Sequence, residues 1–193
     1  FNEWEKIEEK TAGDIKEKFA KYFDEKAFFI VDGISVECVA AKLKGYDILI
    51  MEKGDKIGNE IKAFMKMVYK PLLLVPNRKI KGFERVLFAN DGEVCSNRSV
   101  SEFLKHFENI KEITSLEVGI EPDEETGSYI RGRGVALNVI QKQGDAASLI
   151  LAEVEKYDMM IMGNLRHFFF LEKLTGKTGA NILEKVQVPV FIG

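Results

Sequence analysis

A glycine-bearing segment near the end of the chain has the composition of an anion-binding loop. Gly163 follows the apolar run Met159–Met162, and Gly176-Lys177-Thr178 comes thirteen positions later, at the start of a helix-like segment. Backbone N–H groups at a helix start, at the positive end of the helix dipole, bind anions. Lys177 and Thr178 would add a cation and a hydroxyl donor for a phosphate. The pattern therefore predicts a phosphate site.

A second polar feature follows another apolar run. The run 86–89 leads directly into Asn90-Asp91-Gly92. In open α/β sheets, ligands bind beyond the carboxyl ends of the strands, where the strand order reverses. Asp91 could therefore face a ligand, or it could cap the helix that follows it. The segment 163–178 has two readings as well, a working nucleotide loop or a degenerate connection.

The elements around these residues alternate between strand and helix. Short continuous apolar runs are typical of strands that are buried on both faces. Helical spacing of apolar residues marks amphipathic helices between them. The sequence predicts strands at 27–31, 48–51, 72–75, 86–89, 113–118, 135–140, 159–162 and 190–192, and helices within 4–23, 57–68, 97–109 and 123–129. This alternation predicts an α/β fold.

Two parts of the chain repeat each other. Tyr46-Asp47-Ile48-Leu49-Ile50-Met51 matches Tyr157-Asp158-Met159-Met160-Ile161-Met162 at an offset of 111, and Gly33 matches Gly144 at the same offset. The segment 68–72 matches 186–190 at an offset of 118, with Pro71 against Pro189. Three ordered matches predict two related units, 1–78 and 85–193, joined by the linker 79–84. The first unit lacks the strand–helix–strand opening of the second, so we expect it to be incomplete at its N-terminus.

These features resemble the universal stress protein family, over essentially the whole chain and in two tandem copies. The resemblance rests on Asp91 after the first strand of the second unit, Met162-Gly163 after its fourth, Gly176 and Val188-Pro189-Val190. The family's nucleotide-binding branch has Gly, two residues, Gly, nine residues, Gly and then Ser or Thr. Here Arg166 replaces the second Gly, and Lys177 replaces the Ser or Thr, with Thr178 one position later.

The resemblance implies a fold and a site. In each complete unit it implies an open parallel five-stranded sheet in the order 3-2-1-4-5, flanked by helices, and it implies that the two units pack as a pseudo-dimer. It places ATP or AMP, with or without Mg²⁺, in the second unit. Asp91 would meet the ribose or base, Val118 would offer its backbone to adenine, and Arg166 would either crowd a phosphate or pair with it. The implied site residues are Asn90, Asp91, Val118, Met162, Gly163, Arg166, Gly176, Lys177, Thr178 and Asn181.

The implied function is that of a sensor or regulator in the stress response, non-catalytic or very slow in ATP hydrolysis, with an unknown protein partner and the option of a homodimer. The first unit's shorter loop, 51–58, carries two acids, and we expect no nucleotide there. The alternative is a nucleotide-free interaction scaffold with a degenerate loop. Phe168-Phe169-Phe170 would then serve a protein interface instead of packing between the units.

Composition argues against other classes. The 193 residues carry a net charge of -3, which disfavours electrostatically driven binding to nucleic acid or to a membrane surface. No apolar run approaches the roughly 18 residues of a membrane helix. The two cysteines fit a reducing cytoplasm. Neither histidine has a second ligand at metal-binding spacing, and Leu171 stands where a Walker A loop before Gly176 needs a glycine.

Overall fold

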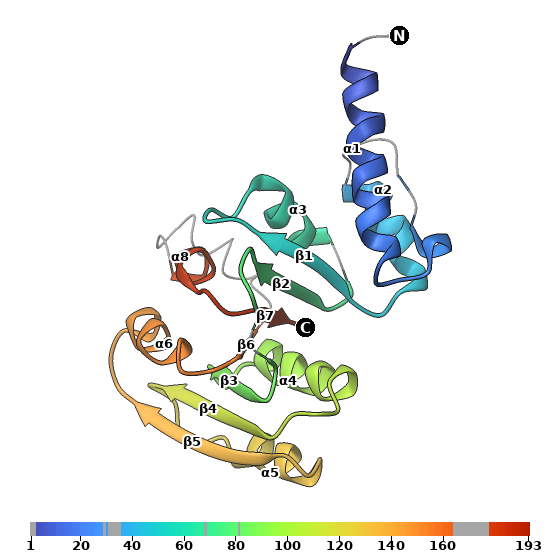
Figure 1. The fold of residues 1–193 in the computed structure, drawn as a ribbon. Coiled ribbons are helices and arrows are strands. Elements are labelled where there is room, and N and C mark those ends of the chain that lie inside the picture. Colours follow the sequence, from blue (N-terminus) through green and yellow to red (C-terminus); the bar gives the residue numbers. More distant parts are fainter. Residues whose placement is uncertain (1–2, 29, 31–35, 68, 81, 164–177) are drawn as a thin grey trace. The chain divides into compact units, whose positions relative to one another are not determined.

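The computed structural model describes residues 3–28, 30, 36–67, 69–80, 82–163 and 178–193 (Figure 1). The chain divides into two compact units, Phe1–Val39 and Ala40–Gly193. The described helices are α1 (Glu3–Ala20), η1 (Glu25–Ala27), α2 (Val36–Lys42), η2 (Leu43–Gly45), α3 (Asn59–Met67), α4 (Val94–His106), α5 (Glu124–Gly132), α6 (Ala146–Val154) and α8 (Thr178–Lys185). The described strands are β1 (Leu49–Lys53), β2 (Leu72–Pro76), β3 (Arg85–Asn90), β4 (Glu112–Val118), β5 (Ala136–Lys142), β6 (Met159–Met162) and β7 (Val190–Ile192).

The unit Phe1–Val39 is largely helical where it is described. At the end of α1, the Phe19 and Phe23 rings stack with centroids 4.9 Å apart, and Phe28 lies 5.5 Å from Phe19. The strand predicted at 27–31 is wrong at its start, because Ala27 ends the 3₁₀ helix η1. The Asp24 side chain caps η1 by accepting a hydrogen bond from the backbone N–H of Lys26. Residues 29 and 31–35 lie outside the described residues.

The strands of the unit Ala40–Gly193 form one seven-stranded sheet in the order β1-β2-β7-β6-β3-β4-β5. All neighbouring pairs are parallel except β2 and β7, which are antiparallel with Leu72 opposite Ile192 and Leu74 opposite Val190. The predicted five-stranded sheet is therefore wrong in its strand count. The backbone groups on one side of β7 pair with β2, so the strands before and after residue 84 share one sheet. The structure does not show the predicted pair of tandem copies packed as a pseudo-dimer.

The strands that follow residue 84 lie in the order β5-β4-β3-β6-β7 within this sheet. The structure thus has the predicted α/β class, a mostly parallel sheet flanked by helices. The unit boundaries at 78 and 85 stay predictions. In the structure β2 ends at Pro76 and β3 begins at Arg85.

Helices cover the sheet on both faces, because successive side chains of a strand point to opposite sides. On one face, α3, α6 and α8 pack on Leu72, Leu74, Leu87 and Met160. On the other face, α4 and α5 pack on Leu73, Val86, Phe88 and Ile161. The Phe103 ring of α4 packs edge-on against Phe191 of β7, with centroids 5.3 Å apart. This burial on both faces explains why the central strands β6 and β7 read as unbroken apolar runs, whereas the edge strand β5 is largely exposed.

Two helices begin where local capping places them. The helix expected at 97–109 is α4, which starts three residues earlier, since Gly92 takes a positive φ of 73° and Glu93 is extended. The short helical stretch expected at 123–129 is α5. Asp123 caps it by accepting a hydrogen bond from the backbone N–H of Thr126 at 3.1 Å. Two acidic residues, Glu124 and Glu125, occupy its first turn and favour the positive end of its dipole.

Candidate functional site

The candidate site lies where the order of the strands reverses. From β3, the chain continues to β4 on one side, while β6 pairs with β3 on the other side. Ala89 of β3 lies opposite Met162 of β6, so the two strands end together at the same edge of the sheet. Asp91 and Gly163 follow these two ends. Crevices of this kind, beyond the carboxyl ends of parallel strands, hold ligands in doubly wound sheets.

Asn90, the last residue of β3, is buried and holds two segments of this edge together. Its side-chain amide donates to Oδ2 of Asp123 at 3.1 Å. Its Oδ1 accepts the backbone N–H of Gly92 at 3.0 Å. Since Asn90 is only 3% exposed, the structure places it beneath the edge as a support for the β3–α4 and β4–α5 connections.

Asp91 caps the turn before α4. Its Oδ1 accepts the backbone N–H of Glu93 at 3.0 Å and the hydroxyl of Ser96. These contacts hold the turn that leads into α4. The N-cap of α4 is Glu93, with no side-chain cap hydrogen bond, so the contacts do not make Asp91 the helix cap, and its role toward a ligand stays a prediction. Asp91 is also solvent-exposed.

A polar network that the sequence did not predict connects α4 to α5. Oγ1 of Thr126 donates to Oδ1 of Asn97 at 2.5 Å. Burial raises the pKa of Asp123, but hydrogen bonds from Asn90 and from Thr126 outweigh it and leave the pKa below its usual value. Asp123 is therefore a carboxylate that the protein holds ionised. An Asp before the pair Glu124-Glu125 is an N-cap signal, and that signal could have located the start of α5.

Gly163 marks a close approach of backbone to backbone. A Cβ atom at this position would lie 2.9 Å from Oγ of Ser96 and 3.2 Å from the backbone nitrogen of Ser96. No L side chain fits at such distances without a shift of the surrounding chain. The chain leaving β6 therefore passes directly against the first turn of α4, beside the Asp91 side chain that holds Ser96.

The other predicted site residues lie in different settings. Val118 ends β4 opposite Lys142, and the next N–H, that of Gly119, donates to the Lys142 carbonyl at 3.0 Å. Met162 is buried in the sheet. Thr178 is the first residue of α8, and Asn181 is half-buried in that helix. Arg166, Gly176 and Lys177 lie outside the described residues, as does Phe168-Phe169-Phe170. The structure thus brings Asn90, Asp91 and Gly163 together and does not place the loop residues.

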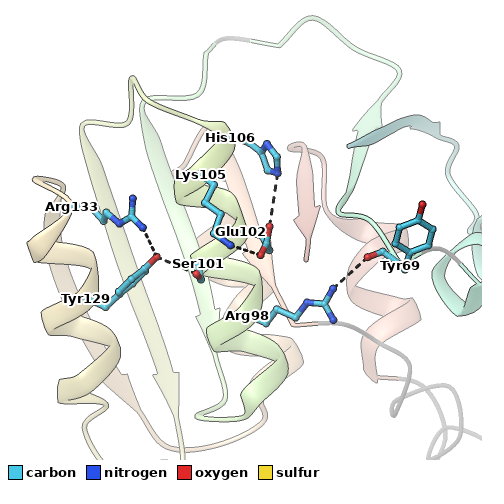
Figure 2. Close-up of polar contacts among 8 residues, drawn as sticks. All are labelled: Tyr69, Arg98, Ser101, Glu102, Lys105, His106, Tyr129 and Arg133. Atoms are coloured by element: carbon cyan, nitrogen blue, oxygen red, sulfur yellow. Dashed lines mark hydrogen bonds and ion pairs between the residues drawn. The ribbon is translucent and has the colours of Figure 1, made fainter. Parts of the chain in front are cut away.

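The outer face of α4 is held by surface contacts away from this edge (Figure 2). The Ser101 hydroxyl lies 3.1 Å from the Tyr129 hydroxyl of α5, which also accepts from Arg133 at 3.1 Å. Nearer the start of α4, Arg98 donates to the carbonyl of Tyr69 at 3.4 Å. These contacts connect α4 to its neighbours and fix the helix whose first turn borders the site.

In the part of the chain that the structure describes, no group of three or more His, Cys, Asp or Glu is arranged to hold a metal ion. Among the described helices, none combines the length and the apolar character that a bilayer-spanning helix requires.

Comparison with known sequences finds similarity to a universal stress protein. The protein is 22% identical over 179 residues to the universal stress protein Slr1230 of Synechocystis. The match covers 82% of this chain and 62% of that protein, so the chain spans less than two thirds of the relative's length. No protein-family model matches the chain.

Comparison of structures points the same way. A universal stress protein from Archaeoglobus fulgidus aligns with a TM-score of 0.72 and 16% identity, over 99% of this chain and 78% of that one. At this identity the likeness shows the fold. A universal stress protein in complex with cAMP aligns over 58% of this chain and 97% of its own, at 16% identity and a TM-score of 0.48, which is too low to relate its ligand site to this chain. This chain is thus similar in sequence to one universal stress protein and similar in fold to another.

Proposed function

We propose that this protein is a stress-response sensor or regulator that binds an adenine nucleotide, ATP or AMP, at the carboxyl edge of the strands β3 and β6. The proposal rests on one observation above all. Asp91 and Gly163, at the ends of these two strands, meet at the point where the strand order reverses, which is where doubly wound sheets bind nucleotides.

The start of α8 would supply donors for a phosphate at this edge. Gly163 itself is explained by packing, since a Cβ atom there would lie 2.9 Å from Oγ of Ser96, and its backbone stands at the strand end where the phosphate would bind. The helix α8, with eight residues, starts at Thr178. Its first N–H groups and the adjacent Lys177 would supply donors and charge for the phosphates.

We propose slow turnover or none. The two carboxylates at this edge are already hydrogen-bonded to protein groups, Asp91 to Glu93 and Ser96, and Asp123 to Asn90 and Thr126. Hydrogen bonds lower the pKa of Asp123, which makes it a weak base. Binding would thus act through the surface presented to a protein partner and not through consumption of the nucleotide.

Isothermal titration of ATP and AMP into matched lysine variants tests this proposal. Lys177→Gln removes the cation next to the start of α8, and Lys185→Gln removes a cation at the other end of the same helix. We expect Lys177→Gln to weaken nucleotide binding by about tenfold, which corresponds to about 1.4 kcal/mol, and Lys185→Gln to leave it unchanged. Equal effects of the two variants would contradict the site. The absence of binding in the parent protein would favour the nucleotide-free scaffold.

A further inference from the structure

A pocket lies at the opposite edge of the sheet from the candidate nucleotide site. Its lining includes Arg85 at the start of β3, Asp158 just before β6, and Pro189 just before β7. Because β2 runs antiparallel to β7, the carboxyl end of β2 at Pro76 also reaches this edge. The pocket has a volume of about 280 Å³, close to the lower bound of about 300 Å³ for small-molecule sites. Its size fits a ligand no larger than a single ring or a short chain.

The two acids that line this pocket, Asp158 and Glu155, already have hydrogen-bond and ion-pair partners within the protein. Asp158 accepts the backbone N–H of Arg85 at 3.0 Å and its guanidinium at 3.3 Å. Glu155 accepts the backbone N–H of Gln187 at 3.2 Å and lies 3.5 Å from the guanidinium of Arg78. The carboxylates therefore serve to hold β3 against β6 and to fix the segment before β7, and their charge is largely matched.

The cations retain unused donors. Among the described residues, Arg78 has one ion pair, a long one, and its side chain is 44% exposed. Lys79, which also lines the pocket, makes no ion pair with the residues that the structure describes. The lining cations Arg78, Lys79 and Arg85 outnumber the lining acids Glu155 and Asp158 by one. The pocket thus offers positive charge and hydrogen-bond donors to a ligand.

A buried lysine adds to this positive field. Lys53 ends β1 in register with Pro76 of the pocket wall, and it is only 2% exposed. It makes no ion pair with any described residue. Burial lowers the pKa of Lys53 and the charge of Arg78 adds to that shift, whereas the carboxylates of Asp55, Glu155 and Glu184 oppose it.

The rest of the wall is mixed, with Tyr157 and Gln187 beside four apolar residues. Pro76, Ile80, Val188 and Pro189 line the pocket beside the cations. We propose that this pocket binds a small organic oxyanion, a carboxylate or a phosphate monoester, whose charged end lies at Arg78 and Lys79 and whose apolar body lies against the prolines and Ile80. This site is independent of the nucleotide proposal, since it shares no residue with the β3–β6 carboxyl edge.

The test is titration calorimetry of the whole chain with three probes: benzoate, phenyl phosphate and inorganic phosphate. The double variant Arg78→Gln/Lys79→Gln removes the two cations, which are exposed enough for the fold to tolerate the change. Arg131→Gln/Lys105→Gln is the matched control, because each of these side chains lies on the surface with one partner, Glu124 or Glu102. Ile80→Ser tests the apolar wall.

We expect saturable binding of at least one organic probe, weakened about tenfold or more in the double variant, equivalent to about 1.4 kcal/mol, and unchanged in the control. The tighter of benzoate and phenyl phosphate identifies the head group. Ile80→Ser should weaken the organic probes and leave inorganic phosphate unaffected. No saturable binding of either organic probe would overturn the proposal. So would equal affinity for inorganic and phenyl phosphate, or a loss of binding in Lys177→Gln that the double variant does not reproduce.

Discussion

Gly163 and Ser96 lie so close that a Cβ atom on Gly163 would sit 2.9 Å from the Ser96 hydroxyl and 3.2 Å from the Ser96 nitrogen. The two residues come from the end of β6 and the first turn of α4, which are 67 positions apart in the sequence. Asp91 holds the same serine hydroxyl. The glycine, the serine and the aspartate therefore form one packed junction at the carboxyl edge, and its integrity sets the shape of the candidate nucleotide site.

Substitution of Gly163 should show the tightness of this junction. Gly163→Ala is expected to lower the free energy of unfolding by about 1–3 kcal/mol, because the new methyl group overpacks against Ser96. The control is Gly132→Ala, where a Cβ atom meets nothing within 4 Å in the last turn of α5. Urea denaturation of both variants is the measurement. In a Ser96→Ala background the cost of Gly163→Ala should fall, and an unchanged cost would argue against a direct clash.

Asp91 variants test how the Asp91 side chain holds the turn before α4. Asp91→Ala removes the acceptor for the backbone N–H of Glu93 and for the Ser96 hydroxyl, so we expect a loss of about 1 kcal/mol in unfolding free energy. Asp91→Asn keeps a side-chain oxygen in the same place and should retain most of the stability. Denaturant unfolding at neutral pH gives both values. An equal loss in the two variants would show that the negative charge, and not the acceptor geometry, is what the fold requires.

Glu153 should contribute a pH-dependent part of the stability. Its buried carboxylate accepts from Lys142 at 2.6 Å and from Lys156 at 2.8 Å. These two hydrogen bonds hold the pKa of Glu153 below its ordinary value of 4.5. The carboxylate is therefore more acidic in the folded state, so its contribution is fully present above pH 4.5 and is lost as the pH falls through the lower folded pKa.

The measurement is the free energy of unfolding as a function of pH for the parent protein and for Glu153→Gln. We expect the parent curve to fall more steeply on the acid side, and the two curves to converge at the lowest pH. Glu121→Gln, at an exposed position, is the control and should follow the parent. Parallel curves for the parent and Glu153→Gln would contradict the lowered pKa.

Tyr129 should titrate below the usual range of tyrosine. The hydrogen bond with Ser101 is the main cause of its lowered pKa; burial opposes it, and the hydrogen bond and charge of Arg133 add to it. Ser101→Ala should therefore raise the pKa of Tyr129 toward its ordinary value. Ultraviolet titration of phenolate absorbance, with Tyr129→Phe to assign the signal, measures the shift. Ser128→Ala, at an exposed position of α5, should cause none.

Much of the fold could be predicted because each strand is recognisable from its own residues. Strands buried on both faces appear as continuous apolar runs, such as Val190–Ile192. The predicted strand ranges match β1 to β7 within a residue or two, although the edge strand β5 is largely exposed. The antiparallel contact between β2 and β7 could not be predicted in this way. It depends on which sheet edges meet in three dimensions, and neither Leu72 nor Ile192 carries a local signal for its partner.

The site was predictable in part for a similar reason. Asp91 and Gly163 stand directly after strands, and the ends of parallel strands share one edge, so their proximity follows from the topology. Asn97 and Thr126 lie inside helices, where a hydrogen bond between side chains of different helices leaves no local pattern. For the same reason Ser96 could not be identified as the neighbour of Gly163.

The most direct test of the central claim is thermal unfolding of the protein with and without excess ATP or AMP, in the presence and absence of Mg²⁺. A ligand that binds only the folded state at about a hundredfold over its dissociation constant adds about 2.7 kcal/mol of stability. For a chain of this size, the unfolding midpoint should then rise by several degrees. We predict such a rise with at least one of the two nucleotides. An unchanged midpoint at millimolar concentrations of both would contradict nucleotide binding at the β3–β6 edge.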